Sequence, residues 1–100
     1  MKLVYTALFD RQRKEVIARY PRFREYFDET ERRILKEPFA SAEEPILFGE
    51  KHIHARKRYI KTTFFSGLLR DQYLYLTLTY MLTADDKIVI LFLTMKTYID

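Results

Sequence analysis

Residues 72–94, QYLYLTLTYML-TADD-KIVILFLT, decide the fold of this chain. In Gln72–Leu82 every second residue is a large apolar one, and Tyr, Thr or Met fill the positions between. This period of two is typical of a β-strand with one face in the core. Lys87–Thr94 is apolar on both faces, which is typical of a central strand covered on both sides. Because the polar stretch Thr83–Asp86 joins them, the segment predicts a hairpin of neighbouring strands.

The first half of the chain predicts one strand and two helices. Lys2–Leu8 is rich in strand formers, and Asp10 is the expected N-cap of a helix over Arg11–Tyr20. A second helix, which ends before Pro38, carries side chains at helical spacing on its inner side: Phe23, Tyr26, Phe27, Thr30 and Ile34. The charged residues of that helix, Glu31 among them, are expected to face solvent.

The order of these elements indicates an α+β fold. After the helices, residues 46–49 are expected to form a short strand or a loop packed on the core, and residues 51–64 contain a further strand candidate. Two N-terminal helices are therefore expected on one face of a small antiparallel sheet. The opposite face is expected to be only partly covered, which leaves room for chemistry or partners. A chain of 100 residues is expected to form one domain, spanning residues 1–100.

Composition excludes several classes of protein. The chain has no cysteine, which excludes disulfides, thiolate chemistry and zinc sites built on cysteine. No apolar run approaches the roughly 18 residues of a membrane span, and the N-terminus lacks a secretory signal, so we expect a cytoplasmic protein with no membrane partner. The core is small, which favours sharing the hydrophobic load with a partner or in a homodimer.

Positive charge is concentrated in one segment. The chain holds 18 Lys and Arg against 14 Asp and Glu, and residues 51–61, KHIHARKRYIK, contain five of the basic residues, both histidines and no acidic residue. Localised charge of this kind attracts a polyanion. The alternatives are a solvated basic strand or loop with no ligand, and an edge strand that its charge protects from pairing.

Strand geometry places the chemistry of this segment on one face. In a regular strand His52, His54, Arg56 and Arg58 project together, and Tyr73, Tyr75 and Thr77 of the next strand are expected on the same surface. The basic groups then span on the order of 20 Å. A single phosphate is too small for this reach, so single-stranded nucleic acid is the expected ligand.

These residue types are the ones that metal-independent RNA cleavage requires. Histidine exchanges protons near neutral pH, arginine holds a phosphate and stabilises its developing charge, and tyrosine stacks on a base or donates a proton. A His-x-His pair also ligates metals, but no third ligand is marked by spacing, so neither a metal nor another cofactor is predicted. The acidic pairs Glu43-Glu44 and Asp85-Asp86 are expected to be solvated.

The layout resembles the RelE/ParE superfamily of toxins from toxin–antitoxin systems. The resemblance covers most of the chain and lies in the helical hairpin Arg11–Lys36, the basic strand Lys51–Lys61, the strands that follow it and Lys96-Thr97-Tyr98. It implies a ribosome-associated mRNA endoribonuclease inhibited by a cognate antitoxin. The chain departs from the family where Tyr73-Leu74 replaces a frequent Tyr-Arg pair and where Thr94-Met95 precede the lysine.

On these grounds we predict two sets of site residues. The catalytic set is His54, Arg56, Arg58, Lys96 and Tyr98. The nucleic-acid-binding set is Lys51, His52, Lys57, Lys61, Tyr73 and Tyr75. The alternatives are a ParE-like toxin that binds DNA gyrase without cleaving RNA, a basic nucleic-acid-binding module, and an interaction domain whose open sheet face pairs with itself or with a partner.

Overall fold

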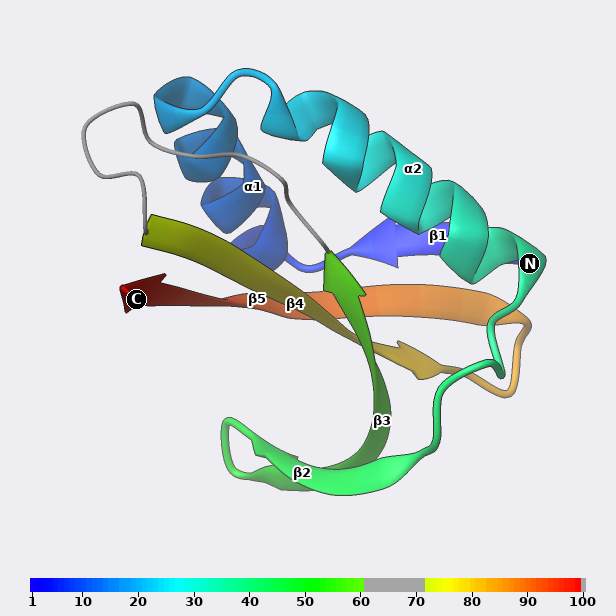
Figure 1. Cartoon of the computed structure of the whole chain (residues 1–100). Coiled ribbons are helices and arrows are strands. Elements are labelled where there is room, and N and C mark those ends of the chain that lie inside the picture. The colour runs from blue at the N-terminus through cyan, green and yellow to red at the C-terminus, as the bar shows by residue number, and fades with distance from the viewer. Residues whose placement is uncertain (61–71, 100) are drawn as a thin grey trace.

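Two helices lie on one face of a five-stranded mixed sheet in the computed structural model of the chain (Figure 1). The structure describes residues 1–60 and 72–99, with the side chains of residues 72–75 and 97–99 left out. Its elements are β1 (Lys2–Tyr5), α1 (Ala7–Arg19), α2 (Phe23–Lys36), β2 (Glu44–Phe48), β3 (Lys51–Ile60), β4 (Gln72–Leu82) and β5 (Lys87–Ile99). The strands follow the order β1-β5-β4-β3-β2. The predicted α+β class is confirmed.

The sheet departs from the prediction at one edge. Strands β2 to β5 pair antiparallel as expected, but β1 pairs parallel with β5, from Lys2 opposite Lys87 to Tyr5 opposite Ile90. The parallel pairing arises because β1 leads directly into the helices, and the chain returns to the sheet at its far edge before β5 comes back beside β1. Strand β5 therefore has neighbours on both sides, which confirms its prediction as a central strand.

Helix α1 begins earlier than predicted, and Thr6 rather than Asp10 is its N-cap. The Thr6 hydroxyl accepts a hydrogen bond from the Phe9 amide at 3.1 Å, and it donates one to the carbonyl of Leu91. Nearly two turns after Thr6, the Gln12 side-chain amide donates to the Leu93 carbonyl at 3.1 Å and accepts from the Leu93 amide at 2.8 Å. These bonds attach α1 to β5 beyond the end of β1.

The leucine stripe of β4 forms the floor of the core, as predicted. Leu76, Leu78 and Tyr80 are fully buried, and they pack with β5 residues and with the aromatic and aliphatic side chains of both helices: Phe9, Phe23, Phe27, Ile34, Ile88 and Ile90. Each such side chain contributes about 2 kcal/mol of transfer free energy. The core thus lies between the helices and the sheet.

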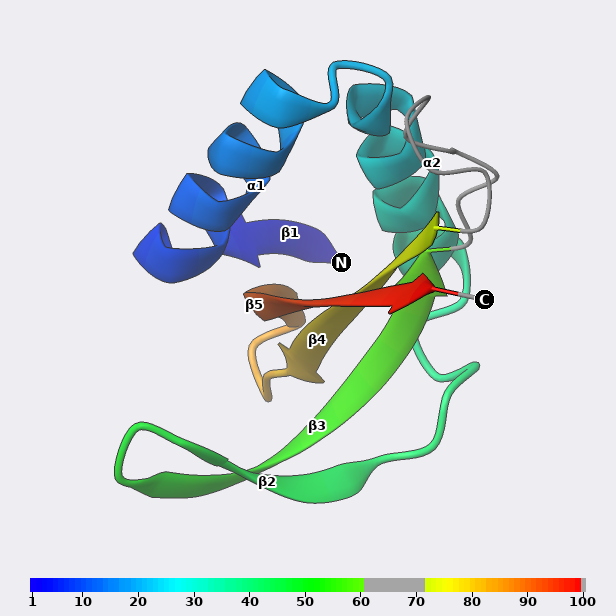
Figure 2. The same ribbon diagram turned by 60° about the vertical axis from the view of Figure 1, so that its left-hand side comes forward.

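The other face of the sheet is partly closed by the chain itself. Strand β3 bends strongly, so that the β2–β3 hairpin curls beneath β4 and β5 (Figures 1 and 2). Phe48 from this hairpin stacks on Phe92 with ring centroids 5.7 Å apart, and Ala55 and Thr79 are buried on the same face. The exposed part of this face, which we call the open face, carries Tyr59, Thr94 and Lys96 among the described side chains.

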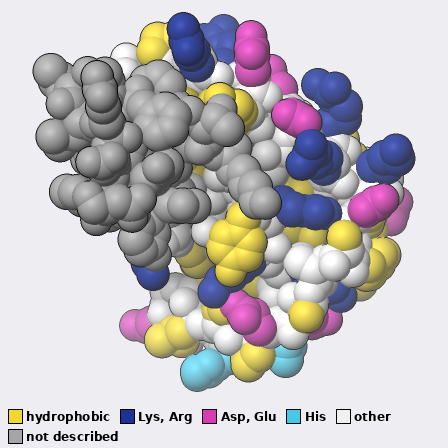
Figure 3. All heavy atoms as spheres, viewed as in Figure 1, with side chains coloured by type: hydrophobic (Ala, Val, Ile, Leu, Met, Phe, Trp, Pro, Cys, Tyr) yellow, Lys and Arg dark blue, Asp and Glu magenta, His cyan; other side chains and the backbone are white. Residues whose placement is uncertain are grey.

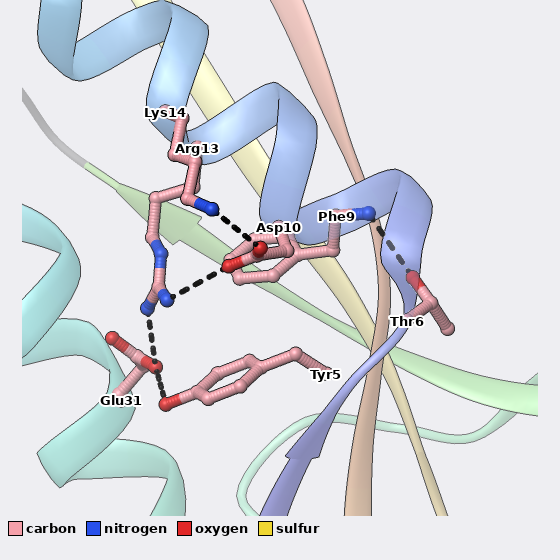
Figure 4. A network of polar contacts seen from close by, with 7 residues as sticks. All are labelled: Tyr5, Thr6, Phe9, Asp10, Arg13, Lys14 and Glu31. Carbon is pink, nitrogen blue, oxygen red and sulfur yellow. Dashed lines mark hydrogen bonds and ion pairs between the residues drawn. The ribbon is translucent and has the colours of Figure 1, made fainter.

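A polar network joins the two helices to β1 (Figure 4). Glu31 is only 6% exposed, although its place on the charged side of α2 predicted a solvated residue. Its carboxylate accepts hydrogen bonds from the Tyr5 hydroxyl and, at 3.3 Å, from Arg13. The Arg13 guanidinium also lies 4.6 Å from the centroid of the Tyr5 ring. The prediction that Glu31 is solvated is wrong, because β1 and α1 pack against this part of α2. Tyr5 of β1 and Arg13 of α1 supply the hydrogen bonds that its charge needs.

Glu31→Ala should destabilise the fold by about 2 kcal/mol, because it leaves Arg13 and the Tyr5 hydroxyl without their shared acceptor. Chemical denaturation would measure the change. The matched control is Glu29→Ala on the same helix, whose exposed pair with Arg33 is worth less than about 0.5 kcal/mol. Equal losses for the two variants would show that the network adds nothing.

The stability of the protein should also fall at high pH. Burial, and then the neighbouring Glu31 carboxylate, raise the pKa of Tyr5 above its ordinary value of 10.0. A raised pKa stabilises the fold fully below the unfolded value, and this contribution is lost as the pH rises through the folded one. Tyr5→Phe should therefore weaken the decline in unfolding free energy as the pH rises above the ordinary tyrosine pKa of 10.0, measured by denaturant titration. An unchanged decline would contradict the assignment.

Candidate functional site

The register between β3 and β4 decides which side chains share a face. Arg56 pairs with Tyr80 and Arg58 with Leu78, whereas Tyr59 pairs with Thr77. Both arginines therefore lie on the helix side of the sheet, with the leucine stripe, and not beside Thr77 as predicted. A shift of one residue reverses the faces of a strand, and the alternation of β3 alone does not reveal how it pairs with β4.

On the helix side, β3 and β4 hold the loop that joins α2 to β2. Three side chains donate hydrogen bonds to backbone carbonyls of this loop: Arg58 to Glu37 at 2.9 Å, Tyr80 to Pro38 at 2.7 Å, and Arg56 to Ser41. The Tyr80 hydroxyl also lies 3.3 Å from that of Ser41. Residues 37–43 are thus held against the sheet, and the side chains they carry have defined positions.

Four side chains meet where this loop enters β2, and we call them the Glu43 cluster: Phe39, Glu43, His54 and Arg56. The Glu43 carboxylate lies 3.7 Å from His54 Nδ1 and 3.5 Å from Arg56 Nη2. The Arg56 guanidinium lies 5.1 Å from the centroid of the Phe39 ring. The cluster therefore combines a carboxylate, an imidazole, a guanidinium and an aromatic ring.

Exposure within the cluster differs from residue to residue. The His54 side chain is 69% exposed and Phe39 is 65% exposed, whereas the Arg56 side chain is only 15% exposed. His54 and Phe39 are accordingly accessible to a ligand. Arg56 is mostly buried, and it contacts Phe39 and Glu43. The sequence analysis did not predict Glu43 and Phe39 as site residues, because both meet β3 only in the folded chain. Glu44 lies opposite Ala55, which places Glu43 beside Arg56, and the loop before β2 brings Phe39 to the same arginine.

The β2–β3 hairpin carries three more of the predicted binding residues, Lys51, His52 and Lys57. His52 and Lys51 are exposed, and the histidines (cyan) project from the lower edge of the molecule in Figure 3. His52 lies on the same face as His54, two residues away, which is about 7 Å along a strand. Lys57 lies on the opposite face of β3 from His52 and His54. Its ammonium group pairs with Glu44 at 2.7 Å, and this hydrogen bond raises the pKa of Lys57.

Lys96 lies apart from the Glu43 cluster. It is exposed on β5 and pairs in register with Tyr75, which is about 16 Å along β4 from Tyr80, the partner of Arg56. Tyr98 pairs in register with Tyr73, further along the same strands. Lys61 and the side chains of Tyr73, Tyr75 and Tyr98 lie outside the described residues. The predicted catalytic set therefore divides between two regions of the sheet.

The open face near Lys96 contains an aromatic residue that the sequence reasoning did not select. Tyr59 is 71% exposed, and Thr77, its partner in β4, pairs in turn with Thr94 of β5. The exposure of Tyr59 could have been predicted from its alternation with Ile60, because the apolar Ile60 marks the core side of β3.

Within residues 1–60 and 72–99, no three His, Cys, Asp or Glu side chains are grouped to hold a metal ion.

No helix in the described part of the chain is long and apolar enough to cross a membrane. Comparison with protein-family models, curated proteins and solved structures found no match to this chain.

Tyr80→Phe should destabilise the protein by about 1–2 kcal/mol and loosen the loop of residues 37–43, because the Pro38 carbonyl loses its donor. Denaturation would measure the first effect and amide hydrogen exchange in the loop the second. Tyr59→Phe is the matched control, since the exposed Tyr59 should give a change within about 0.5 kcal/mol. Unchanged exchange in Tyr80→Phe would refute the role of this bond in holding the loop.

Proposed function

We propose that this protein is a metal-independent endoribonuclease and the toxin of a toxin–antitoxin pair, acting on mRNA at the ribosome. The observation that carries the proposal is the convergence of His54 and Arg56 on the carboxylate of Glu43. A carboxylate-oriented imidazole beside a guanidinium supplies both the proton transfer and the positive charge that phosphodiester cleavage needs.

In the proposed reaction His54 is the general base. Its Nδ1 faces Glu43, so Nε2 is left to take the proton from the 2′-hydroxyl of the RNA. The 2′-oxygen then attacks the adjacent phosphorus, and the bond from phosphorus to the 5′-oxygen breaks. The products are a 2′,3′-cyclic phosphate and a 5′-hydroxyl, and the step consumes no metal ion or other co-reactant.

Two further groups complete the chemistry. Arg56 and Arg58, which share a face of β3, supply positive charge for the phosphorane. His52 is the nearest group to protonate the departing 5′-oxygen, because about 7 Å of strand separates it from His54 on the same face. Tyr98 was predicted for proton transfer, but it lies in register with Tyr73, away from the Glu43 cluster, so His52 replaces it in this role.

The remaining predicted residues contribute affinity in this proposal. Lys51 and Lys57 add positive charge near the hairpin, and Lys96, with Tyr59 on the open face, offers a second contact for a long strand. The formal net charge of +4 favours both RNA and an acidic antitoxin as partners. Two helices on a small sheet support the proposal at the level of the α+β class, which is the class that the resemblance to RelE/ParE toxins implies. A cytoplasmic location is part of the same proposal.

One observation favours a second candidate, a toxin or module that binds nucleic acid or gyrase without catalysis. Arg56 is largely buried, and both Arg56 and Arg58 already donate to loop carbonyls. Arginines occupied in this way are less free to clamp a phosphate than exposed ones. In this candidate the exposed histidines and lysines bind a polyanion, and no proton transfer takes place.

His54→Ala and Glu43→Gln should each lower RNA cleavage at least about 100-fold, because the first removes the general base and the second its charged partner. The measurement is cleavage of translated mRNA, and of free RNA, in the presence of EDTA. Arg24→Ala, an exposed cation on α2 outside the cluster, is the control and should keep wild-type activity.

Two outcomes would decide against cleavage at this site. Wild-type protein that cuts neither translated nor free RNA is not a ribonuclease. Growth inhibition that survives His54→Ala but is lost when Lys51, Lys57 and Lys96 are replaced by alanine supports the second candidate. Binding without cleavage would then suffice for toxicity.

A further inference from the structure

We propose that Phe39 is a stacking subsite for an unpaired nucleobase, so that the substrate is single-stranded RNA bound with one base flat against this ring. The inference deepens the proposed function and rests on it for the identity of the ligand. It concerns a residue on the loop between α2 and β2, outside the basic segment that carries the predicted site.

The exposure of Phe39 is the first observation. The ring is a large apolar surface with 65% of it facing solvent, and it lies beside the guanidinium of Arg56, a group suited to phosphate binding. The loop is fixed by hydrogen bonds to backbone carbonyls before and after Phe39 in the chain, at Pro38 and Ser41. The ring is therefore held exposed at a defined place, which lowers the entropy lost when a ligand stacks on it.

Arg56 gives the ring its second property. The guanidinium carbon lies 5.1 Å from the ring centroid, so the arginine supports one side of Phe39 while much of the ring stays accessible. A nucleobase stacked on the ring would extend this stack. Stacking on aromatic rings is open to every base, because each has a π face.

The same arginine connects the subsite to the reacting groups. Arg56 contacts Phe39 with its guanidinium and Glu43 through Nη2, and Glu43 in turn contacts His54. A base on Phe39 thus belongs to a nucleotide next to the phosphate that His54 and Arg56 would engage. A duplex keeps its bases stacked inside, so the subsite selects single strands, loops and ends.

The chain lacks tryptophan, so Phe39→Trp introduces a single indole reporter at the proposed subsite. The probe is a 2′-O-methyl oligonucleotide, which binds but cannot be cleaved because its 2′-oxygen carries no proton. We expect this single strand to quench the indole fluorescence of Phe39→Trp. The same oligonucleotide with abasic sites should quench it far less, and a duplex of the same sequence should leave it unchanged.

Affinity gives an independent readout. Phe39→Ala should weaken binding of the single strand about 5- to 100-fold but leave binding of the abasic strand unchanged, because a stacked base is worth about 1–3 kcal/mol. Ala18→Trp places an indole at an exposed position on α1, away from the Glu43 cluster, and should show no quenching. Equal losses for the base-containing and abasic strands, or no quenching in Phe39→Trp, would overturn the subsite.

The two proposals fail separately. If quenching requires bases but the wild-type protein does not cleave natural RNA, the Phe39 subsite stands and the proposed catalysis is refuted. If the wild-type protein cleaves RNA but quenching does not depend on bases, the catalysis stands and the subsite is refuted. A protein that binds no oligonucleotide and cuts neither translated nor free RNA refutes both.

Discussion

The pairing of Arg56 with Tyr80 across β3 and β4 is the constraint on which the candidate site depends. It turns both arginines of β3 toward the helix side, where their donors meet the carbonyls of the loop after α2. Tyr80 is fully buried in the core, and its hydroxyl holds the same loop from beneath. The position of Phe39 and Glu43 is therefore set by a core residue of β4, and the site and the core cannot be changed independently.

Much of the fold follows from local patterns in the chain, and the site does not. The alternation of Gln72–Leu82 and the apolar stretch in Lys87–Thr94 are enough to predict a central hairpin, because burial on one face or two leaves a direct trace in the sequence. The parallel pairing of β1 and the register of β3 depend on contacts between distant segments. The roles of Glu31 and Glu43 could not be predicted from the residues next to them in the sequence, because the partners of each lie on another element.

The concentration of basic residues in β3 overstates the free positive charge of the surface. Glu43 and Glu44, which the sequence places in a separate acidic pair, lie against β3 and contact His54, Arg56 and Lys57. The strand is thus accompanied by its own carboxylates, and a nucleic acid would have to compete with them for these cations. Exposed stacking surfaces gain importance for recognition in such a setting, because carboxylates do not compete for an aromatic ring.

The attachment of α1 to β5 has a consequence for the solubility of the protein. Strand β1 ends at Tyr5, and a bare sheet border at that point would be a template for pairing with another chain. The Gln12 amide occupies both the donor and the acceptor of Leu93, in the manner of a peptide group from a neighbouring strand. With Thr6 holding the Leu91 carbonyl, the helix prevents growth of the sheet at this stretch and guards it against aggregation.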